Sequence, residues 1–488
     1  MGGFSNTASG NFTSIVGGFK NTASANFSSI VGGTRNNFEG GSDGYGCSIS
    51  HKFIGGGCLN QIGFNSRGNA YQSGKFSSIV GGQENKICQC WAFIGGGCKN
   101  IINGYGNTKS VIVGGNQNTV NAYSSHVFIG GGSQNYASSA NTVIVGGVCN
   151  SNSSCYGFIG AGRQNSISGY EGADSIVGGK YNRIVGTYGV NNQQNFIGGG
   201  CRNCINGLKT SIVGGVFNTA SSSNCSFIGG GYCNTLFNSK GSSIVGGGNN
   251  IISGSTIAPL SNFNVIGGSS NTISGSFTAV FGLSNTASRH CANFIAGEGN
   301  SINSVSSYYG TTTPNHSTIA GGCGNTLTDS SGFIGGGACN TISGYYTGAG
   351  NVIGGGSCNC IDSAYSSILG GMYNTASGQR TVIGGGCKNY ISKFDNHAAI
   401  LGGRHNCIDL NAIAGGVSND IFLIGSYLTA SDSGAVCQKI AYMNNTVVTG
   451  SLTVGSQDAI NATVGRICLL YTSPSPRDRT RSRMPSSA

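Results

Sequence analysis

Charged residues, and the residue types that perform acid–base chemistry, are scarce in this sequence. Of 488 residues, 8% are charged, and the chain has 14 Asp and Glu and 6 His. None of them forms a metalloprotease or nucleophile-elbow motif. The 25 Lys and Arg are spread thinly, without the block or stripe that is typical of nucleic-acid binding. The sequence therefore predicts no enzyme, no cofactor and no nucleic-acid partner.

Proline and long apolar runs are scarce too. No stretch reaches the roughly 18 consecutive apolar residues of a membrane-spanning helix. Three of the 5 prolines fall in 468–488, which contains none of the repeat described below. This segment resembles a translated sequencing-adapter read-through, and we expect it to be a non-native, disordered tail. Gly2 to Asn6 begin inside a repeat, so we also expect the chain to be a fragment.

Glycine is abundant, with 89 residues, and it follows a repeat. The sequence Ser-Ile-Val-Gly-Gly-x-x-Asn, or its variant Phe-Ile-Gly-Gly-Gly-x-x-Asn, recurs along almost the whole chain, most often every 15 residues. Such a period marks a solenoid in which each unit must stack on the next. Residues that define the repeat include the anchors Asn21, Asn60, Asn100, Asn218 and Asn340, the glycines Gly18, Gly57 and Gly97, the isoleucines Ile54 and Ile94, and the aromatics Phe93 and Phe128.

A unit of this length with this much glycine predicts a β-coil. Glycine would destabilise a helix by up to ~1 kcal/mol per residue. At ~3.3 Å per residue, the repeat makes a coil of two short strands and two tight turns. We therefore predict an all-β, parallel β-solenoid of about 25 coils, one for each anchor Asn. Gly and Asn are expected to supply the turn positions with positive φ, and the longer spacings, such as Asn36 to Asn60, to be loops pushed out of one turn.

The first strand of each coil is apolar on both faces. From Ile79 to Ile244, coils with Phe-Ile-Gly alternate with coils with Ile-Val, so a large residue meets a small one in each neighbouring coil. Because side chains alternate across a strand, the Ile row and the Phe/Val row face opposite ways. We expect the Ile row to fill the coil and the Phe/Val row to pack against other chains. Val265, Ala279 and Phe294 are exceptions to the Ile row.

The tandem pattern of Ser14 to Gly18 followed by Asn21 to Ser24 resembles the head repeats of YadA-type trimeric autotransporter adhesins and related repeats in bacteriophage tail-fibre proteins. The resemblance covers residues 2 to about 426. It implies a left-handed parallel β-roll over 1–426, a β-rich neck or connector over 427–467, and a homotrimer about a threefold axis. It also implies an extracellular location, on a bacterial cell surface or a virion.

Nine of the 20 cysteines occupy equivalent positions one or two residues before an anchor, as Cys58, Cys98 and Cys339 do. The favoured interpretation is a small, buried, reduced side chain in the turn. Disulfides between coils or across a trimer remain an alternative, and isolated pairs such as Cys88 and Cys90 do not have the spacing of a zinc site.

The predicted function is therefore a non-enzymatic structural or adhesive fibre. Its long loops would contact a cell-surface glycan or protein receptor, with Tyr45, His51, Tyr71, Tyr308 and Tyr309 as candidate contact residues. An ice-binding β-solenoid is the alternative, because Asn-Thr-x-Ser places hydroxyls on the outward face of several coils. Lys86, Tyr136 and Arg183 interrupt that row.

Overall fold

The fold is described by a computed structural model. It covers residues 2–38, 50–63, 74–103, 109–121, 126–186, 194–254, 263–288, 294–303, 316–344, 350–409, 420–425, 429–430 and 439–443. The chain divides into two compact units, Met1–Ala441 and Tyr442–Ala488. The solenoid lies in the first unit.

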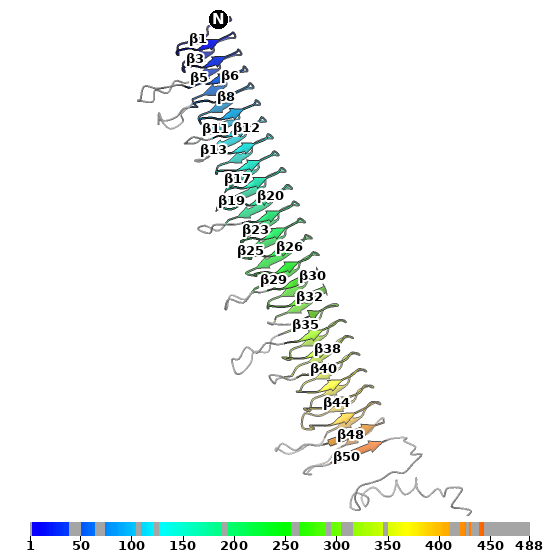
Figure 1. Ribbon diagram of the computed structural model, residues 1–488. Helices are drawn as coiled ribbons and strands as arrows, with labels where there is room; N and C mark the ends of the chain where they lie inside the picture. The colour runs from blue at the N-terminus through cyan, green and yellow to red at the C-terminus, as the bar shows by residue number, and fades with distance from the viewer. Residues whose placement is uncertain are drawn as a thin grey trace, which may run out of the picture. The chain divides into compact units, whose positions relative to one another are not determined.

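The secondary structure of the described residues consists of short strands and turns, without helix (Figure 1). Each coil adds one strand to each of two 25-stranded sheets. Sheet A holds the even-numbered strands from β2 (Ser14–Ile15) to β50 (Lys439–Met443), and sheet B the odd-numbered ones from β1 (Thr7–Ala8) to β49 (Thr429–Ala430). Pairing is parallel between equivalent strands of successive coils, as between β10 (Phe93–Ile94) and β12 (Val111–Ile112). The prediction of an all-β parallel solenoid is confirmed.

Most strands are two or three residues long, and the second residue of each points into the coil. In sheet A the inward residues include Ile54 and Ile94, and in sheet B they include Ala23 and Ile62; all four are fully buried. Among the described residues, six strands are five or six residues long: β17 (Ser151–Cys155), β19 (Ser166–Glu171), β30 (Val265–Ser269), β32 (Ala279–Leu283), β48 (Asp420–Ile424) and β50. A register shift interrupts the pairing of β17 with β19, and β30 pairs with β32 over all five residues. The Ile row therefore fills the coil, as the sequence predicts.

The three exceptions to the Ile row are shortened coils rather than substitutions. Ile244 pairs with Ile266, which pairs with Val280, which pairs with Ile295, and all of these are fully buried. Each inward residue lies one position after Val265, Ala279 or Phe294. One residue is missing between the inward residue and the positive-φ glycine, and the backbone after the inward residue absorbs the deletion so that the apolar ladder stays continuous.

The insertions leave the stack intact. Across the long spacing from Asn36 to Asn60, Ile30 pairs with Ile54 and Phe38 with Ile62, without a change of register. The inserted residues themselves lie outside the described ranges. The two sheets also continue past residue 426, the boundary that the repeat pattern predicts, through β49 and β50.

Successive described coils share a third parallel contact, which the repeat pattern alone does not reveal. The residue two positions before the anchor forms an isolated bridge to its equivalent in the next coil, as in Cys58 to Gln83 to Cys98. The coil is therefore held along three lines, at the two strands and at the turn between them.

Glycine is required three residues before the anchor. Gly18, Gly57 and Gly97 have φ of +100°, +91° and +89°. A Cβ on Gly57 or Gly97 would lie 2.0 Å from the carbonyl oxygen of the equivalent glycine in the next coil. Both the backbone conformation and the close approach of the next coil exclude a side chain here.

The anchor Asn has a different role from the one predicted, because anchors such as Asn60 and Asn100 do not adopt positive φ. The second left-handed position is the residue before the anchor, whatever its type, as at Leu59 (φ 58°) and Lys99 (φ 57°). The left-handed conformation is thus adopted by Leu59 and Lys99, not by the anchors, so it cannot be the reason for asparagine at the anchor position. Asparagine is needed there for the hydrogen bonds of its side chain.

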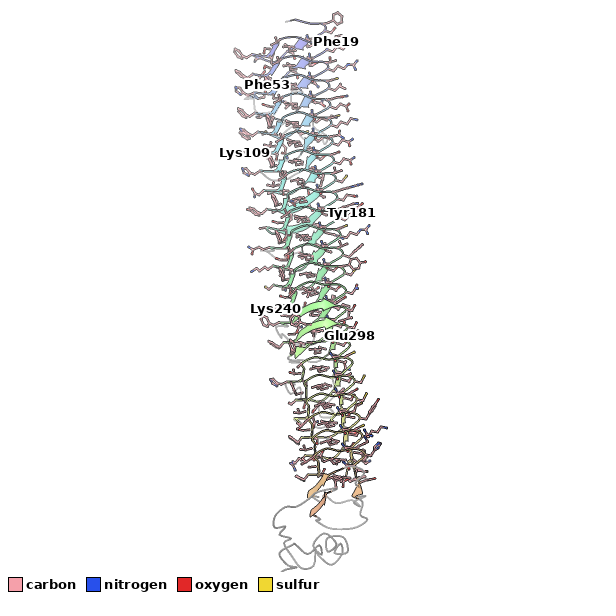
Figure 2. The ribbon with its side chains drawn as sticks, turned by 90° about the vertical axis from the view of Figure 1, so that its right-hand side faces the viewer. Phe19, Phe53, Lys109, Tyr181, Lys240 and Glu298 are labelled. Atoms are coloured by element: carbon pink, nitrogen blue, oxygen red, sulfur yellow. The ribbon has the colours of Figure 1, made fainter. Side chains whose placement is uncertain are left out.

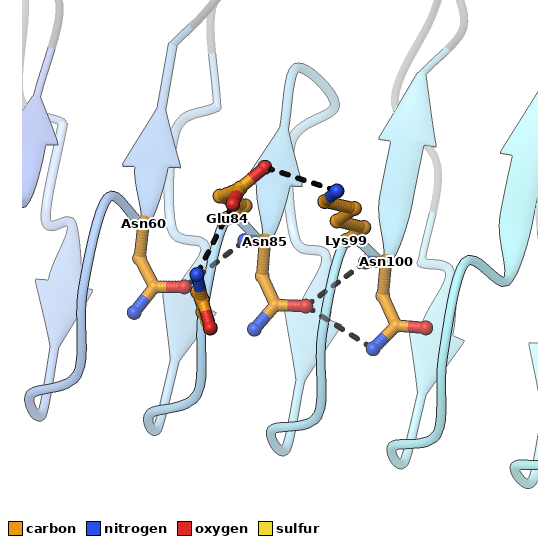
Figure 3. Close-up of polar contacts among 6 residues, drawn as sticks. Asn60, Glu84, Asn85, Lys99 and Asn100 are labelled. Atoms are coloured by element: carbon orange, nitrogen blue, oxygen red, sulfur yellow. Dashed lines mark hydrogen bonds and ion pairs between the residues drawn. The ribbon is translucent and has the colours of Figure 1, made fainter.

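The buried Asn side chains form a hydrogen-bonded ladder along the solenoid (Figure 3). Asn100 donates from Nδ2 to the carbonyl oxygens of Gly96 and, in the next coil, Gly115, both at 2.9 Å. Its Oδ1 accepts the backbone N–H of Asn118 at 3.0 Å. Asn21, Asn60, Asn218 and Asn340 make the equivalent bonds and are likewise fully buried. Each anchor thus closes its own turn and ties it to both neighbouring coils.

Asn118→Ala should lower the stability of the adjoining coils by about 3 kcal/mol, because it leaves several buried partners unsatisfied. Trp91 is the single tryptophan and lies in the preceding coil, so its fluorescence during urea unfolding reports the loss. The matched control is Asn116→Ala, at an exposed residue in the same turn, with an expected change within about 0.5 kcal/mol. Equal effects of the two substitutions would contradict the role of the ladder.

Candidate functional surfaces

An apolar stripe runs along the outer face of sheet A. Phe53, Phe93 and Phe128 are each 37% exposed, and Val80 and Val113 of the intervening coils are each 49% exposed. In Figure 2, Phe53 points away from the opposite edge of the solenoid, where Phe19 and Tyr181 lie. This row, here called the sheet A stripe, points outward from the solenoid, so the outward direction predicted for the Phe/Val row is confirmed.

The alternation of coil types has a local cause. In the Phe coils, the ring lies over the glycine two residues later: Cε1 of Phe93 is 3.5 Å from the point where a Cβ on Gly95 would be. The same Cβ would lie 2.3 Å from the carbonyl oxygen of Val113 in the next coil. The large outward side chain is the first residue of the strand in one coil, as at Phe93, and the residue after the strand in the next, as at Val113. Neighbouring coils therefore fill the sheet A stripe without a steric clash.

A column of stacked rings lies at the turn before sheet A. Phe12, Phe27, His51, Phe76 and Trp91 occupy equivalent positions on successive coils, with ring centroids 4.9 to 5.4 Å apart and near-parallel planes. His51, a predicted contact residue, is exposed and stacks between Phe27 and Phe76. The other predicted contact residues, Tyr45, Tyr71, Tyr308 and Tyr309, lie outside the described residues.

The outer face of sheet B carries mixed side chains. The first strand residue points outward, and Lys86, Tyr136 and Arg183 interrupt the hydroxyl row there, as the sequence predicts. The longest continuous row is Thr272, Thr286, Ser301, Thr326 and Thr341, paired in register over five coils. Hydroxyls two residues further on, such as Thr328, donate to the backbone of the next coil, here to the Ile342 carbonyl oxygen at 3.2 Å.

The edge formed by the two residues before each anchor, here called the Asn-turn edge, is rich in cations and rings. Arg163, Lys180 and Arg202 are exposed there, with Tyr181 and Phe217 between or beside them. This cluster was not predicted from the sequence, because its members on successive coils are 15 to 22 residues apart in the chain. The available signal was their shared position, one or two residues before successive anchors.

The cysteines at this edge are less buried than predicted. Of the 16 described cysteines, Cys90 alone is buried. Cys58 and Cys98 are half-buried and Cys339 is exposed, so the interpretation as buried turn residues is wrong there. The physical reason is that the two residues before the anchor form the outer surface of the turn. Cys204 and Cys360 directly follow an anchor instead, and desolvation by burial raises the pKa of their thiols.

Within the described ranges, no three His, Cys, Asp or Glu side chains gather as a metal ion would require. The described part of the chain also contains no helix long and apolar enough to span a membrane. No protein-family model matches this sequence, and no curated protein matches it either.

Asp174 is a buried carboxylate in the core. Its Oδ1 accepts the backbone N–H of Asn195 at 2.9 Å, whereas Oδ2 has no hydrogen-bond partner among the described residues. Desolvation raises the pKa of Asp174, and the hydrogen bonds from Asn195 oppose that rise. The next coil has Asn195 at the equivalent position, and its Nδ2 donates to the Gly207 carbonyl oxygen at 2.9 Å. Asparagine therefore fits this position better than a charged carboxylate does.

Asp174→Asn should raise the stability at neutral pH by about 1 to 2 kcal/mol. Because the pKa is raised in the folded state, the cost of the carboxylate is present above that pKa and disappears as pH falls below the unfolded value of about 3.9. Thermal melting followed by circular dichroism should show a gain for the variant at pH 7 that vanishes at low pH. A gain that is independent of pH would refute the electrostatic explanation.

Proposed function

We propose that this chain is a non-enzymatic segment of an extracellular fibre, similar to the heads of trimeric adhesins or to phage tail fibres. The observation that carries the proposal is the sheet A stripe on a continuous solenoid. Parallel stacking at ~4.8 Å per coil gives the repeat region a length of roughly 120 Å. A rigid rod of this kind can hold recognition loops away from a cell or virion surface.

Self-association through the sheet A stripe supports the fibre proposal. A contiguous apolar patch of this length exceeds what monomeric soluble proteins expose. From Ile79 to Ile244 the stripe repeats every two coils, so a second and third copy with the same repeat can match it over that length. We therefore propose a homotrimer in which the three stripes face one another. The recognised ligand would be a cell-surface glycan or protein.

Replacing Phe93 and Phe128 together with Asp should dissociate the assembly, because the charges would be buried between chains without partners. Analytical ultracentrifugation should give three times the mass of one chain for the wild type and one chain mass for the variant. The control replaces Phe12 and Tyr156 with Asp; both are strongly exposed in the turn before sheet A, outside the stripe, and the trimer should persist. A stable wild-type monomer would overturn the proposal.

Ice binding is a second candidate, favoured by one observation, the five-coil Thr and Ser row from Thr272 to Thr341. Regularly spaced hydroxyls on a flat sheet face could match an ice lattice along the solenoid axis. If this row binds ice, the protein produces thermal hysteresis and Thr286→Tyr abolishes it, whereas Thr119→Tyr, outside the row, does not. Hysteresis that is absent, or that survives Thr286→Tyr, removes this candidate.

A further inference from the structure

Cationic and aromatic side chains follow one another along the Asn-turn edge over five successive coils. We define it as the Arg202 strip: Arg163, Lys180, Tyr181, Arg202, Phe217 and Tyr232. Parallel bridges from Arg163 through Lys180, Cys201 and Val216 to Tyr232 fix the backbone of the strip. The N–H of Tyr181 donates to the Arg163 carbonyl oxygen, and that of Arg202 to the Lys180 carbonyl oxygen, both at 2.9 Å. The side chains are therefore displayed in register, about 4.8 Å apart per coil.

The rings hold Lys180 and Arg202 in place without neutralising their charges. The Arg202 guanidinium lies between two rings, with Cζ 5.5 Å from the Tyr181 centroid and 5.1 Å from the Phe217 centroid. Lys180 Nζ lies 5.1 Å from the Tyr181 centroid, and Tyr232 packs edge-on against Phe217 at 6.0 Å. Cation–π contacts of this kind restrict the rotamers of long cationic side chains.

The positive charge of the strip is uncompensated among the described residues. None of its three cations forms an ion pair with a described carboxylate, in contrast to Lys99, whose Nζ lies 3.8 Å from Glu84 Oε2 at the same edge. Three exposed cations on successive coils thus present donors to an anionic ligand. A guanidinium held between rings keeps its N–H groups pointing sideways, where they can bind a carboxylate or sulfate through two hydrogen bonds.

The ring geometry selects the class of ligand. Single-stranded nucleic acids bind by stacking bases on free ring faces. Here two cations lie over the Tyr181 ring, and Arg202 and Tyr232 both contact Phe217, so these two rings are engaged with protein neighbours instead of being free to stack on bases. Hydroxyl donors beside fixed cations suit a sugar polymer whose hydroxyls alternate with carboxylates or sulfates.

We propose that the Arg202 strip binds an acidic polysaccharide lying along the solenoid axis. This assignment rests on the proposed function as a surface-recognition fibre and gives it a ligand class and a site outside the long loops. In Figure 2, Tyr181 points away from Phe53, so assembly through the sheet A stripe leaves the strip accessible.

The test measures binding of the full chain to immobilised heparin, a sulfated polysaccharide rich in uronic acid, with neutral dextran as the reference. Replacing Arg163, Lys180 and Arg202 with Gln should weaken heparin binding by about a hundredfold. Arg202→Lys keeps the charge but loses the paired hydrogen bonds, so it should give an intermediate loss. The control replaces Lys20, Lys109 and Lys240 with Gln, which removes the same charge from scattered exposed sites, and it should change binding less than twofold.

Equal losses in the strip and control variants would overturn the proposal, because they would reflect net charge alone. A thymidine oligonucleotide that competes as strongly as free heparin would also overturn it in favour of a nucleic-acid site. Measuring the mass of each sample distinguishes the failure of the heparin site from the failure of the trimer. A monomer that binds heparin through the strip contradicts the trimer but supports the site. A trimer that does not bind heparin contradicts the site and keeps the trimer.

Discussion

One buried Asn side chain in each coil governs the rest of this structure. Its amide donates to the glycine turn of its own coil and to that of the next, and its carbonyl oxygen accepts the backbone N–H of the following anchor. No other common side chain supplies donors and an acceptor in that arrangement at that size. The close approach of the glycine turns, which leaves no space for a Cβ at Gly97, follows from the same contact.

Because the Asn ladder fixes the stacking, the outward residues are free to differ. Every outward position falls on one of a few lines along the solenoid, and equivalent residues lie about 4.8 Å apart. The sheet A stripe, the ring column from Phe12 to Trp91 and the Arg202 strip each arise from this display. Association through one line and ligand binding through another can therefore coexist on a single rod.

Much of the fold could be predicted from the sequence because the repeat is a physical constraint. The inward Ile row, the outward Phe and Val rows and the glycine turn follow from spacing and strand alternation alone. The role of Asn100 could not be predicted, since periodicity does not separate a special backbone angle from a side-chain hydrogen bond. The one-residue deletions at Val265, Ala279 and Phe294 looked like substitutions until strand pairing aligned Ile266, Val280 and Ile295. The Arg202 strip requires register between coils, which a linear reading of the sequence does not give.

Hydrogen exchange of side-chain amides, followed by NMR, tests the Asn ladder most directly. Each anchor Nδ2 in the described coils donates inside the solenoid, so the side-chain amide protons of residues such as Asn100 and Asn218 should exchange far more slowly than those of the exposed Asn116. Protection of the anchors along the whole stack is the predicted result. Anchor amides that exchange as fast as that of Asn116 would show that the coils are held together in another way.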